Sequence, residues 1–169
     1  MKAMIFSAGF GKRLLPITAN IPKALVTIKR RPILDWIIKF LIQSGIDEII
    51  INTHYLADQV ESFIHRKKYK IPITCIYESE LLGTGGGLYN TRKKWGQDNI
   101  YICNVYILCD FDLKTFFLIT MSRVQVYMKL KFYKIKVTNN YFIMIIIIKN
   151  VQGDCSKQKS ILWFLECLK

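Results

Sequence analysis

Cysteine pairs, acidic residues in the last third and long apolar runs are all scarce in this chain of 169 residues. No CxxC spacing and no Cys/His cluster occurs, so neither a disulfide framework nor a cysteine metal site is indicated. An odd number of thiols without such spacing is typical of reduced core cysteines in a cytoplasmic protein. The five cysteines are Cys75, Cys103, Cys109, Cys155 and Cys167.

The most apolar run is too short to cross a membrane. It is YFIMIIII at 141–148, whereas a membrane helix needs roughly 20 residues. The apolar N-terminus is interrupted at Gly9 and Gly11, unlike the core of a signal peptide. We therefore expect a soluble chain that neither spans nor binds a membrane.

Acidic residues are missing mainly from the C-terminal segment. The net charge is +13, and residues 114–169 contain 10 Lys+Arg but only 2 Asp+Glu. Such a balance permits nucleic acid, a membrane surface or phosphorylated small molecules as partners. The basic runs lie at expected element ends with no interleaved aromatic platform, which favours solvated helix ends and makes nucleic-acid binding the weaker alternative. These runs are KRR at 29–31, HRKKYK at 65–70 and RKK at 92–94.

What the sequence does contain is an alternation of strands and helices in residues 1–113. Continuous β-branched runs predict buried strands, and apolar residues at helical spacing predict the helices between them. This order predicts an α/β fold, a parallel sheet covered by helices with ligands beyond the carboxyl ends of the strands. The expected strands are 4–7, 47–53, 71–78 and 100–108, and the expected helices are 32–44, 56–68 and 83–95.

A glycine loop follows the first strand, in SAGFGKRLLPITANIPKAL at 7–25. Glycines expose backbone N–H groups and let a phosphate chain approach closely. The loop is neither a dinucleotide fingerprint, because Leu14 replaces its third glycine, nor a P-loop. Arg13 and Lys23 flank a proline-stiffened segment, which suits the charge neutralisation of phosphoryl or nucleotidyl transfer. The plain alternatives are a tight turn and ordinary surface cations.

The stretch AGFGKRLLPITANIPKAL resembles the signature AGxGxRLxPLTxxxPKPL of sugar-1-phosphate nucleotidyltransferases, also called NDP-sugar pyrophosphorylases. The resemblance continues through PILDWIIKFLIQSGIDEIIINTHYLADQVESFI and ESELLGTGGGLYNTRKKWG, and it spans residues 2 to about 113. It is strongest to short bacterial members that act on N-acetylmuramic acid 1-phosphate or mannose 1-phosphate. The resemblance implies a Rossmann-like parallel sheet with helices on both faces.

The resemblance also implies substrates and site residues. A sugar 1-phosphate would attack the α-phosphorus of an NTP and release pyrophosphate, with Mg²⁺ assisting. Arg13 would stabilise the leaving pyrophosphate, and Lys23 would contact the α-phosphate and the sugar phosphate. The implied nucleotide-binding residues are Ala8, Gly9 and Gly11 at the phosphates, with Glu78, Gly83, Thr84 and Gly85 near the base. Lys12, His54 and His65 are expected to be structural or solvated.

The chain departs from the family pattern after the fourth strand. Where the family has N-x-D, whose aspartate binds Mg²⁺, this chain has Asn104, Val105 and Tyr106. A phenol cannot replace a hard carboxylate ligand, and Asp110 and Asp112 are poor substitutes by position. We therefore expect no complete metal site and impaired activity.

Residues 114–169 resemble no part of the family. We expect a fold truncated or degenerate after the fourth strand, with 1–113 as a nucleotidyltransferase-like half. The segment 114–169 is then an unassigned tail, out of frame or degenerate, although VQVYMKLKFYKIKV alternates as a strand could. The sequence thus leaves three hypotheses: a nucleotidyltransferase by descent, a non-catalytic nucleotide-binding remnant or nonfunctional fragment, and a basic nucleic-acid-binding protein. It fixes neither the nucleotide, the sugar nor the oligomeric state.

Overall fold

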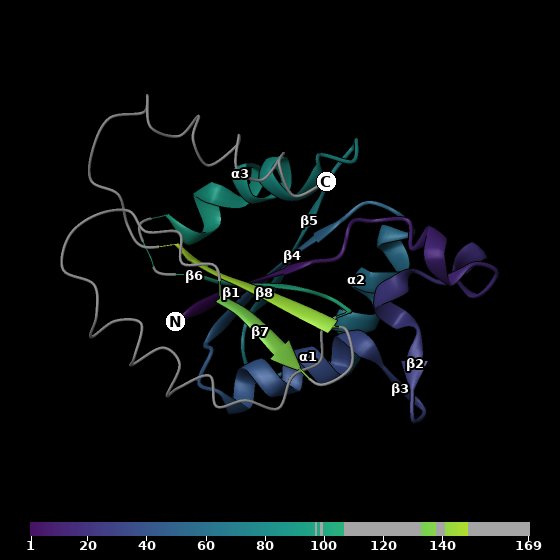
Figure 1. Cartoon of the computed structure of the whole chain (residues 1–169), viewed down its shortest axis with the longest axis horizontal. Helices are drawn as coiled ribbons and strands as arrows, with labels where there is room; N and C mark the ends of the chain where they lie inside the picture. Colours follow the sequence, from purple (N-terminus) through teal and green to yellow (C-terminus); the bar gives the residue numbers. More distant parts are fainter. Residues whose placement is uncertain (97, 99, 107–132, 138–140, 149–169) are drawn as a thin grey trace.

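The computed structural model describes residues 1–96, 98 and 100–106, together with the backbone of 133–137 and 141–148. Its centre is a six-stranded sheet in the order β5-β4-β1-β6-β8-β7 (Figure 1). The α/β fold class and the Rossmann-like sheet with helices on both faces are confirmed.

Four strands form the parallel part of the sheet, and all were expected from the sequence. Strand β1 is central, and its Lys2 lies in register with Glu48 on one side and Ile100 on the other. Because the strands are parallel, their carboxyl ends meet at one edge. They are β1 (Lys2–Phe6), β4 (Glu48–Thr53), β5 (Ile73–Tyr77) and β6 (Ile100–Asn104).

Side chains of β1 alternate between two apolar clusters, one on each face of the sheet. Ala3 and Ile5 belong to a cluster with α1 (Ile33–Gln43) and α2 (Ala57–Lys67). Met4 and Phe6 belong to the other, with Leu88 of α3 (Gly83–Trp95). Figure 1 shows α3 above the sheet and α1 below it. Burial on both faces explains why the strands read as continuous apolar runs.

Residues with a left-handed backbone mark the end of α1 and the start of α2. Helix α1 stops before Gly45, which has φ +88°, and the N–H groups of Gly45 and Ile46 donate to carbonyls of the last turn. Helix α2 begins one residue later than expected because Leu56 has a left-handed backbone. None of the helices in the described ranges combines the length and apolar character that crossing a membrane requires.

Two further strands extend the sheet beyond β6. Strand β8 (Tyr141–Ile148) pairs antiparallel with β6, and β7 (Tyr133–Val137) pairs antiparallel with β8. Strand β7 lies within the alternating stretch 124–137 that the sequence offered as a possible strand. The domain boundary after residue 113 stays a prediction.

The chain between β1 and α1 is irregular and carries most of the glycine-loop signature. It contains three short 3-10 turns and a two-stranded hairpin, and it projects from the edge where the parallel strands end (Figure 1). The turns are Lys12–Leu14, Ile17–Ala19 and Lys23–Leu25, and the hairpin strands are β2 (Thr27–Ile28) and β3 (Arg31–Pro32).

Candidate functional site

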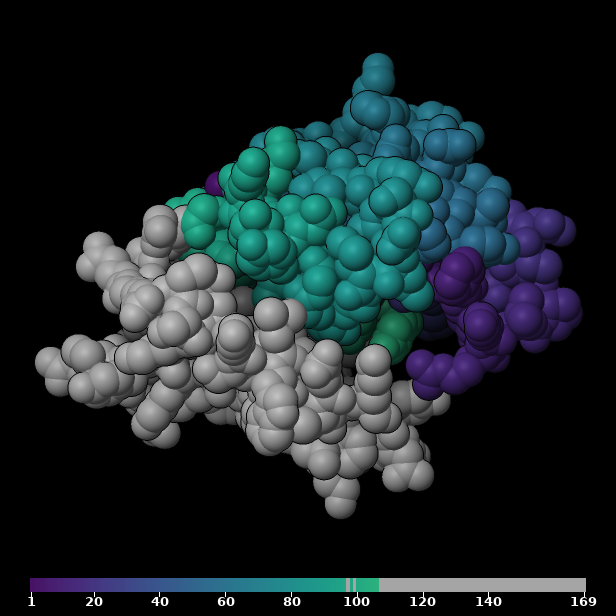
Figure 2. All heavy atoms as spheres, turned by 90° about the horizontal axis from the view of Figure 1, so that it is seen from above, coloured from purple at the N-terminus to yellow at the C-terminus, as the bar shows by residue number. Residues whose placement is uncertain are grey.

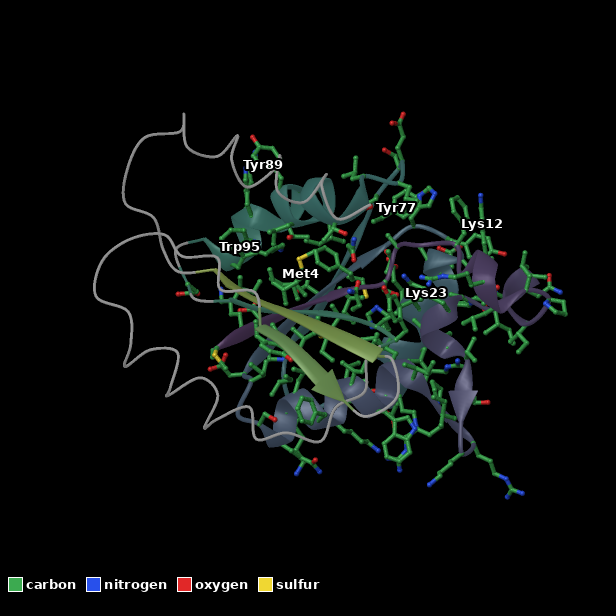
Figure 3. The ribbon with its side chains drawn as sticks, in the orientation of Figure 1. Met4, Lys12, Lys23, Tyr77, Tyr89 and Trp95 are labelled. Atoms are coloured by element: carbon green, nitrogen blue, oxygen red, sulfur yellow. The ribbon has the colours of Figure 1, made fainter. Side chains whose placement is uncertain are left out.

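The candidate site lies at the carboxyl ends of the parallel strands. Figure 3 shows Lys12, Lys23 and Tyr77 at this end, whereas Trp95 lies towards the opposite end of the sheet. In Figure 2 the purple N-terminal loop lies beside the green end of the described segment 100–106 and next to α3. The glycine loop, the end of β6 and the start of α3 therefore surround one region.

Lys23 folds back over the glycine loop. A Cβ atom on Gly9 would lie 3.0 Å from Lys23 Nζ, and one on Gly11 would lie 3.1 Å from Lys23 Cβ. Gly11 has φ +69°, a conformation that L side chains rarely adopt, and its carbonyl accepts a 2.9 Å hydrogen bond from the Thr18 hydroxyl. Both glycines are thus required by close contacts, and the structure brings the predicted Lys23 onto the predicted loop.

The cations at this edge have no acidic partner among the described residues. Burial, with a smaller effect from the Arg13 charge, lowers the pKa of Lys23 from 10.5 to about 8. Both Arg13 and Lys12 are exposed, and no described ion pair includes Lys12, Arg13 or Lys23. An anion that reached Lys23 and Arg13 would relieve their repulsion. The arrangement therefore fits a polyphosphate.

A chain of hydrogen bonds fixes the start of the loop. The Ser7 N–H donates to Asn52 Oδ1 at 2.9 Å, and Asn52 Nδ2 donates to Glu78 Oε1 at 2.7 Å. The Leu82 N–H donates to Glu78 Oε2 at 3.3 Å. These hydrogen bonds join the ends of β1, β4 and β5, so they fix the loop to its neighbouring strands. The Ser7 hydroxyl itself is buried without a hydrogen-bond partner in the described part of the chain.

Glu78 is only 1% exposed, and both of its carboxylate oxygens accept hydrogen bonds from protein groups. Its place beside the glycine loop agrees with a position at the site. Its burial makes it a residue that positions the loop. The predicted contact with a base stays a prediction.

The glycines of GTGGG divide into two groups. Gly83, Thr84 and Gly85 form the first turn of α3, and a Cβ on Gly83 would meet nothing within 4 Å. A Cβ on Gly87 would lie 2.7 Å from Glu78 Oε1 and 2.8 Å from the Asn52 amide nitrogen. Gly83 therefore faces open space, whereas Gly87 lets α3 pack against the hydrogen-bonded pair.

Sequence reasoning missed Asn52 and Thr18 as residues of the site. Asn52 is 2% exposed and directly follows three buried isoleucines, and a polar residue at the end of a buried run was the available signal. His54 Nδ1 lies 2.8 Å from the Glu78 carbonyl oxygen, and its ring stacks on Tyr77. The expectation that His54 is structural agrees with these contacts.

Tyr106 follows β6 at the mouth of the loop. The Val105 N–H donates to the Phe6 carbonyl at 3.2 Å, which holds the two strand ends together. The Tyr106 side chain is 50% exposed, and Lys23 Nζ lies 5.4 Å from the centroid of its ring, within the range of a cation–π contact.

The described residues do not fit Mg²⁺. No group of three or more His, Cys, Asp or Glu side chains gathers in the described ranges. Tyr106 offers a phenol with a lysine ammonium over its ring, and hard carboxylate oxygens are what Mg²⁺ prefers. Asp110 and Asp112 lie outside the described residues. The expected Mg²⁺ cofactor, like its incomplete site, stays a prediction.

Comparisons of sequence identify the relatives of this chain. The profile of the family described as nucleotidyl transferase matches residues 2–136. The D-glycero-alpha-D-manno-heptose 1-phosphate guanylyltransferase of Aneurinibacillus thermoaerophilus is 33% identical over 117 residues, covering 69% of this chain and 51% of the relative. The mannose-1-phosphate guanylyltransferase catalytic subunit beta of Xenopus tropicalis is 34% identical over 118 residues, 68% of this chain and 33% of the relative. The chain thus spans between a third and a half of the length of these curated relatives.

Solved structures agree on the fold. HddC from Yersinia pseudotuberculosis complexed with GMP-PN matches with a TM-score of 0.65 at 24% identity, covering 88% of this chain and 73% of that one. UDP-glucose pyrophosphorylase from Acinetobacter baumanii matches with a TM-score of 0.64 at 22% identity, covering 72% of this chain and 53% of that one. At these identities the likeness shows the fold alone.

Proposed function

The chain belongs to the nucleotidyl transferase family, and from this premise we propose that it binds a nucleoside triphosphate at the glycine loop. By descent it is a sugar-1-phosphate nucleotidyltransferase, because the relatives reported above are named for sugar 1-phosphates. The reaction would transfer NMP from an NTP to a sugar 1-phosphate. The cytoplasmic location expected from the cysteines belongs to the same proposal.

The observation that carries the proposal is the packing of Lys23 on Gly9 and Gly11 without an acidic partner among the described residues. In the reaction, a phosphate oxygen of the sugar 1-phosphate forms a bond to the α-phosphorus. The bond from that phosphorus to the bridging oxygen breaks, and pyrophosphate leaves with the electron pair. Lys23 and Arg13 would bind and orient the phosphates and offset the charge that develops on their oxygens.

A non-catalytic nucleotide-binding protein is the second candidate, and Tyr106 is the observation that favours it. The phenol stands where the family pattern has a carboxylate, and Lys23 lies over its ring. A site built in this way can still hold phosphates by charge. We therefore propose that catalysis is impaired while nucleotide binding is retained.

The test uses the full chain with a panel of NTPs, sugar 1-phosphates and Mg²⁺. Calorimetry measures NTP binding, and a coupled assay follows pyrophosphate. We expect binding, with turnover far below the roughly 1–1000 s⁻¹ of ordinary enzymes. Arg13→Gln should weaken binding, whereas Arg66→Gln, an exposed arginine on α2, should not. The absence of NTP binding both with Mg²⁺ and with EDTA would refute the proposal, and ordinary turnover would refute the impairment.

A further inference from the structure

Tyr106 and Lys23 reach the glycine loop from two separate segments of the chain. Strands β1 and β6 are parallel neighbours with Phe6 opposite Asn104, so Tyr106 lies beside the first residues of the loop. Lys23 Nζ lies 5.4 Å from the Tyr106 ring centroid and would be 3.0 Å from a Cβ on Gly9. The Lys23 ammonium thus lies between the aromatic ring of Tyr106 and the backbone of Gly9, which has no side chain.

No described ion pair includes this ammonium, and several groups near it can donate hydrogen bonds. Lys23 and Arg13 are cations, the Tyr106 hydroxyl can donate a hydrogen bond, and the loop offers backbone N–H groups. The Glu78 carboxylate, which follows β5 at this edge, is buried and accepts hydrogen bonds from Asn52 and Leu82. The described site is therefore complementary to phosphate oxygens that carry no metal ion.

We infer that this chain binds a nucleoside triphosphate without a divalent cation, with the Lys23 ammonium and the Tyr106 hydroxyl contacting phosphate oxygens directly. The inference rests on the proposed nucleotide binding and names the ionic form of the ligand. It follows from the side chain at position 106, because a phenol with an ammonium over its ring cannot serve as the carboxylate ligand that Mg²⁺ prefers. A carboxylate at position 106 would have the opposite preference, since it repels a bare polyphosphate and attracts one that carries a metal.

The experiment measures NTP affinity of the full chain by calorimetry in two buffers, one with EDTA and one with excess Mg²⁺. We expect affinity in EDTA to equal or exceed that in Mg²⁺. Tyr106→Phe removes the hydroxyl and keeps the ring, so the affinity in EDTA should fall about fivefold, the worth of one ordinary hydrogen bond. Tyr106→Asp should weaken binding in EDTA by about tenfold or more, and Mg²⁺ should restore it.

Tyr89→Asp is the matched control. Tyr89 is 52% exposed against 50% for Tyr106 and lies on α3 away from Lys23 (Figure 3). Its substitution should leave both affinities unchanged. Circular dichroism of each variant checks folding, and if Tyr106→Asp does not fold, the wild type and Tyr106→Phe decide.

The outcomes separate this inference from the proposed function. Binding in Mg²⁺ but not in EDTA would overturn the inference and leave the proposed function standing. No binding in either buffer would overturn both. Equal or tighter binding in EDTA, with the metal dependence appearing only in Tyr106→Asp, would support it.

Discussion

Two lysines at opposite ends of one sheet have opposite electrostatic surroundings. At the amino end, Lys2 Nζ lies 3.2 Å from Glu48 and 3.0 Å from Asp98, and hydrogen bonds to both carboxylates raise its pKa. At the carboxyl end, burial and the Arg13 charge lower the pKa of Lys23 to about 8. The α-amino group of Met1 also pairs with a carboxylate, that of Asp47. The amino end thus has balanced charge, and the carboxyl end carries excess positive charge.

The opposite pKa shifts distinguish a lysine that stabilises the fold through carboxylates from a lysine that has no described acidic partner and can bind an anion. A lysine that gains carboxylates on folding adds a little stability, whereas one buried beside another cation reduces stability until an anion arrives. Among the described residues, Lys23 at the glycine loop bears this cost. Substitutions at the two ends of the sheet should therefore have different effects.

The largest expected effect is on ligand affinity, in Lys23→Met. The substitution keeps an apolar stem of similar length and removes the ammonium from the loop, so NTP affinity should fall about 100-fold, which corresponds to about 2.7 kcal/mol. The melting temperature should not fall, because a partly buried charge without an acidic partner is removed. Calorimetry and thermal denaturation measure the two quantities. Lys12→Met, an exposed neighbour, should change affinity less than about threefold, and an equal loss in both variants would contradict the special role of Lys23.

The next effect is on stability, in Asn52→Ala. Removal of the amide leaves the Glu78 carboxylate and the Ser7 N–H buried without their partner, which should lower the free energy of unfolding by about 2 kcal/mol. Urea denaturation measures the change. Asn90→Ala, an exposed position on α3, should change it by less than about 0.5 kcal/mol. Similar losses in both variants would show that the hydrogen-bond chain does not stabilise the loop.

The third effect is the pH dependence of binding. Lys23 in the free protein loses its proton near pH 8, and an anion favours the protonated form, so NTP affinity should fall by up to about fivefold from pH 8 to pH 9. Because the pKa of Lys23 is lowered from 10.5 in the folded state, its contribution to stability should rise with pH between about 8 and 10.5. Calorimetry at several pH values checks the first statement. A flat profile in wild type, or the same slope in Lys23→Met, would contradict it.

The smallest effect is expected for Lys2→Met. Its ion pairs lie at the surface, so their loss should lower the free energy of unfolding by about 0.5 kcal/mol and leave NTP affinity unchanged. The pKa of Lys2 is raised on folding. Its contribution is therefore present below pH 10.5 and is lost as the pH rises through the raised value. Denaturation and calorimetry of the same variant check both. A weaker NTP affinity would show that the two ends of the sheet are coupled.

The strands and helices of the parallel part could be predicted because each depends on local patterns. The run of isoleucines at 49–51 predicts a buried strand without knowledge of its neighbours. The glycine loop and its cations were predictable in the same way, since their spacing lies within one segment. The start of α2 was missed by one residue because no pattern signals the left-handed backbone of Leu56.

Contacts between segments could not be predicted in this way. The hydrogen bond between Asn52 and Glu78 depends on the register of β4 with β5, in which Thr53 lies opposite Tyr77. The contact of Lys23 with Tyr106 requires β6 to pair with β1 and not with β5. Such strand order follows from the packing of all helices together, and it is not contained in the spacing of residues along one segment.

Gly87 sets the height of α3 above the sheet. Its missing side chain leaves room for the Glu78 carboxylate and the Asn52 amide, which would lie within 2.8 Å of any Cβ added there. A larger residue would lift the first turns of the helix and with them the open turn that begins at Gly83. A single hydrogen atom in place of a methyl group therefore sets the position of the turn beside the proposed nucleotide site, and one codon change at this position would move that turn.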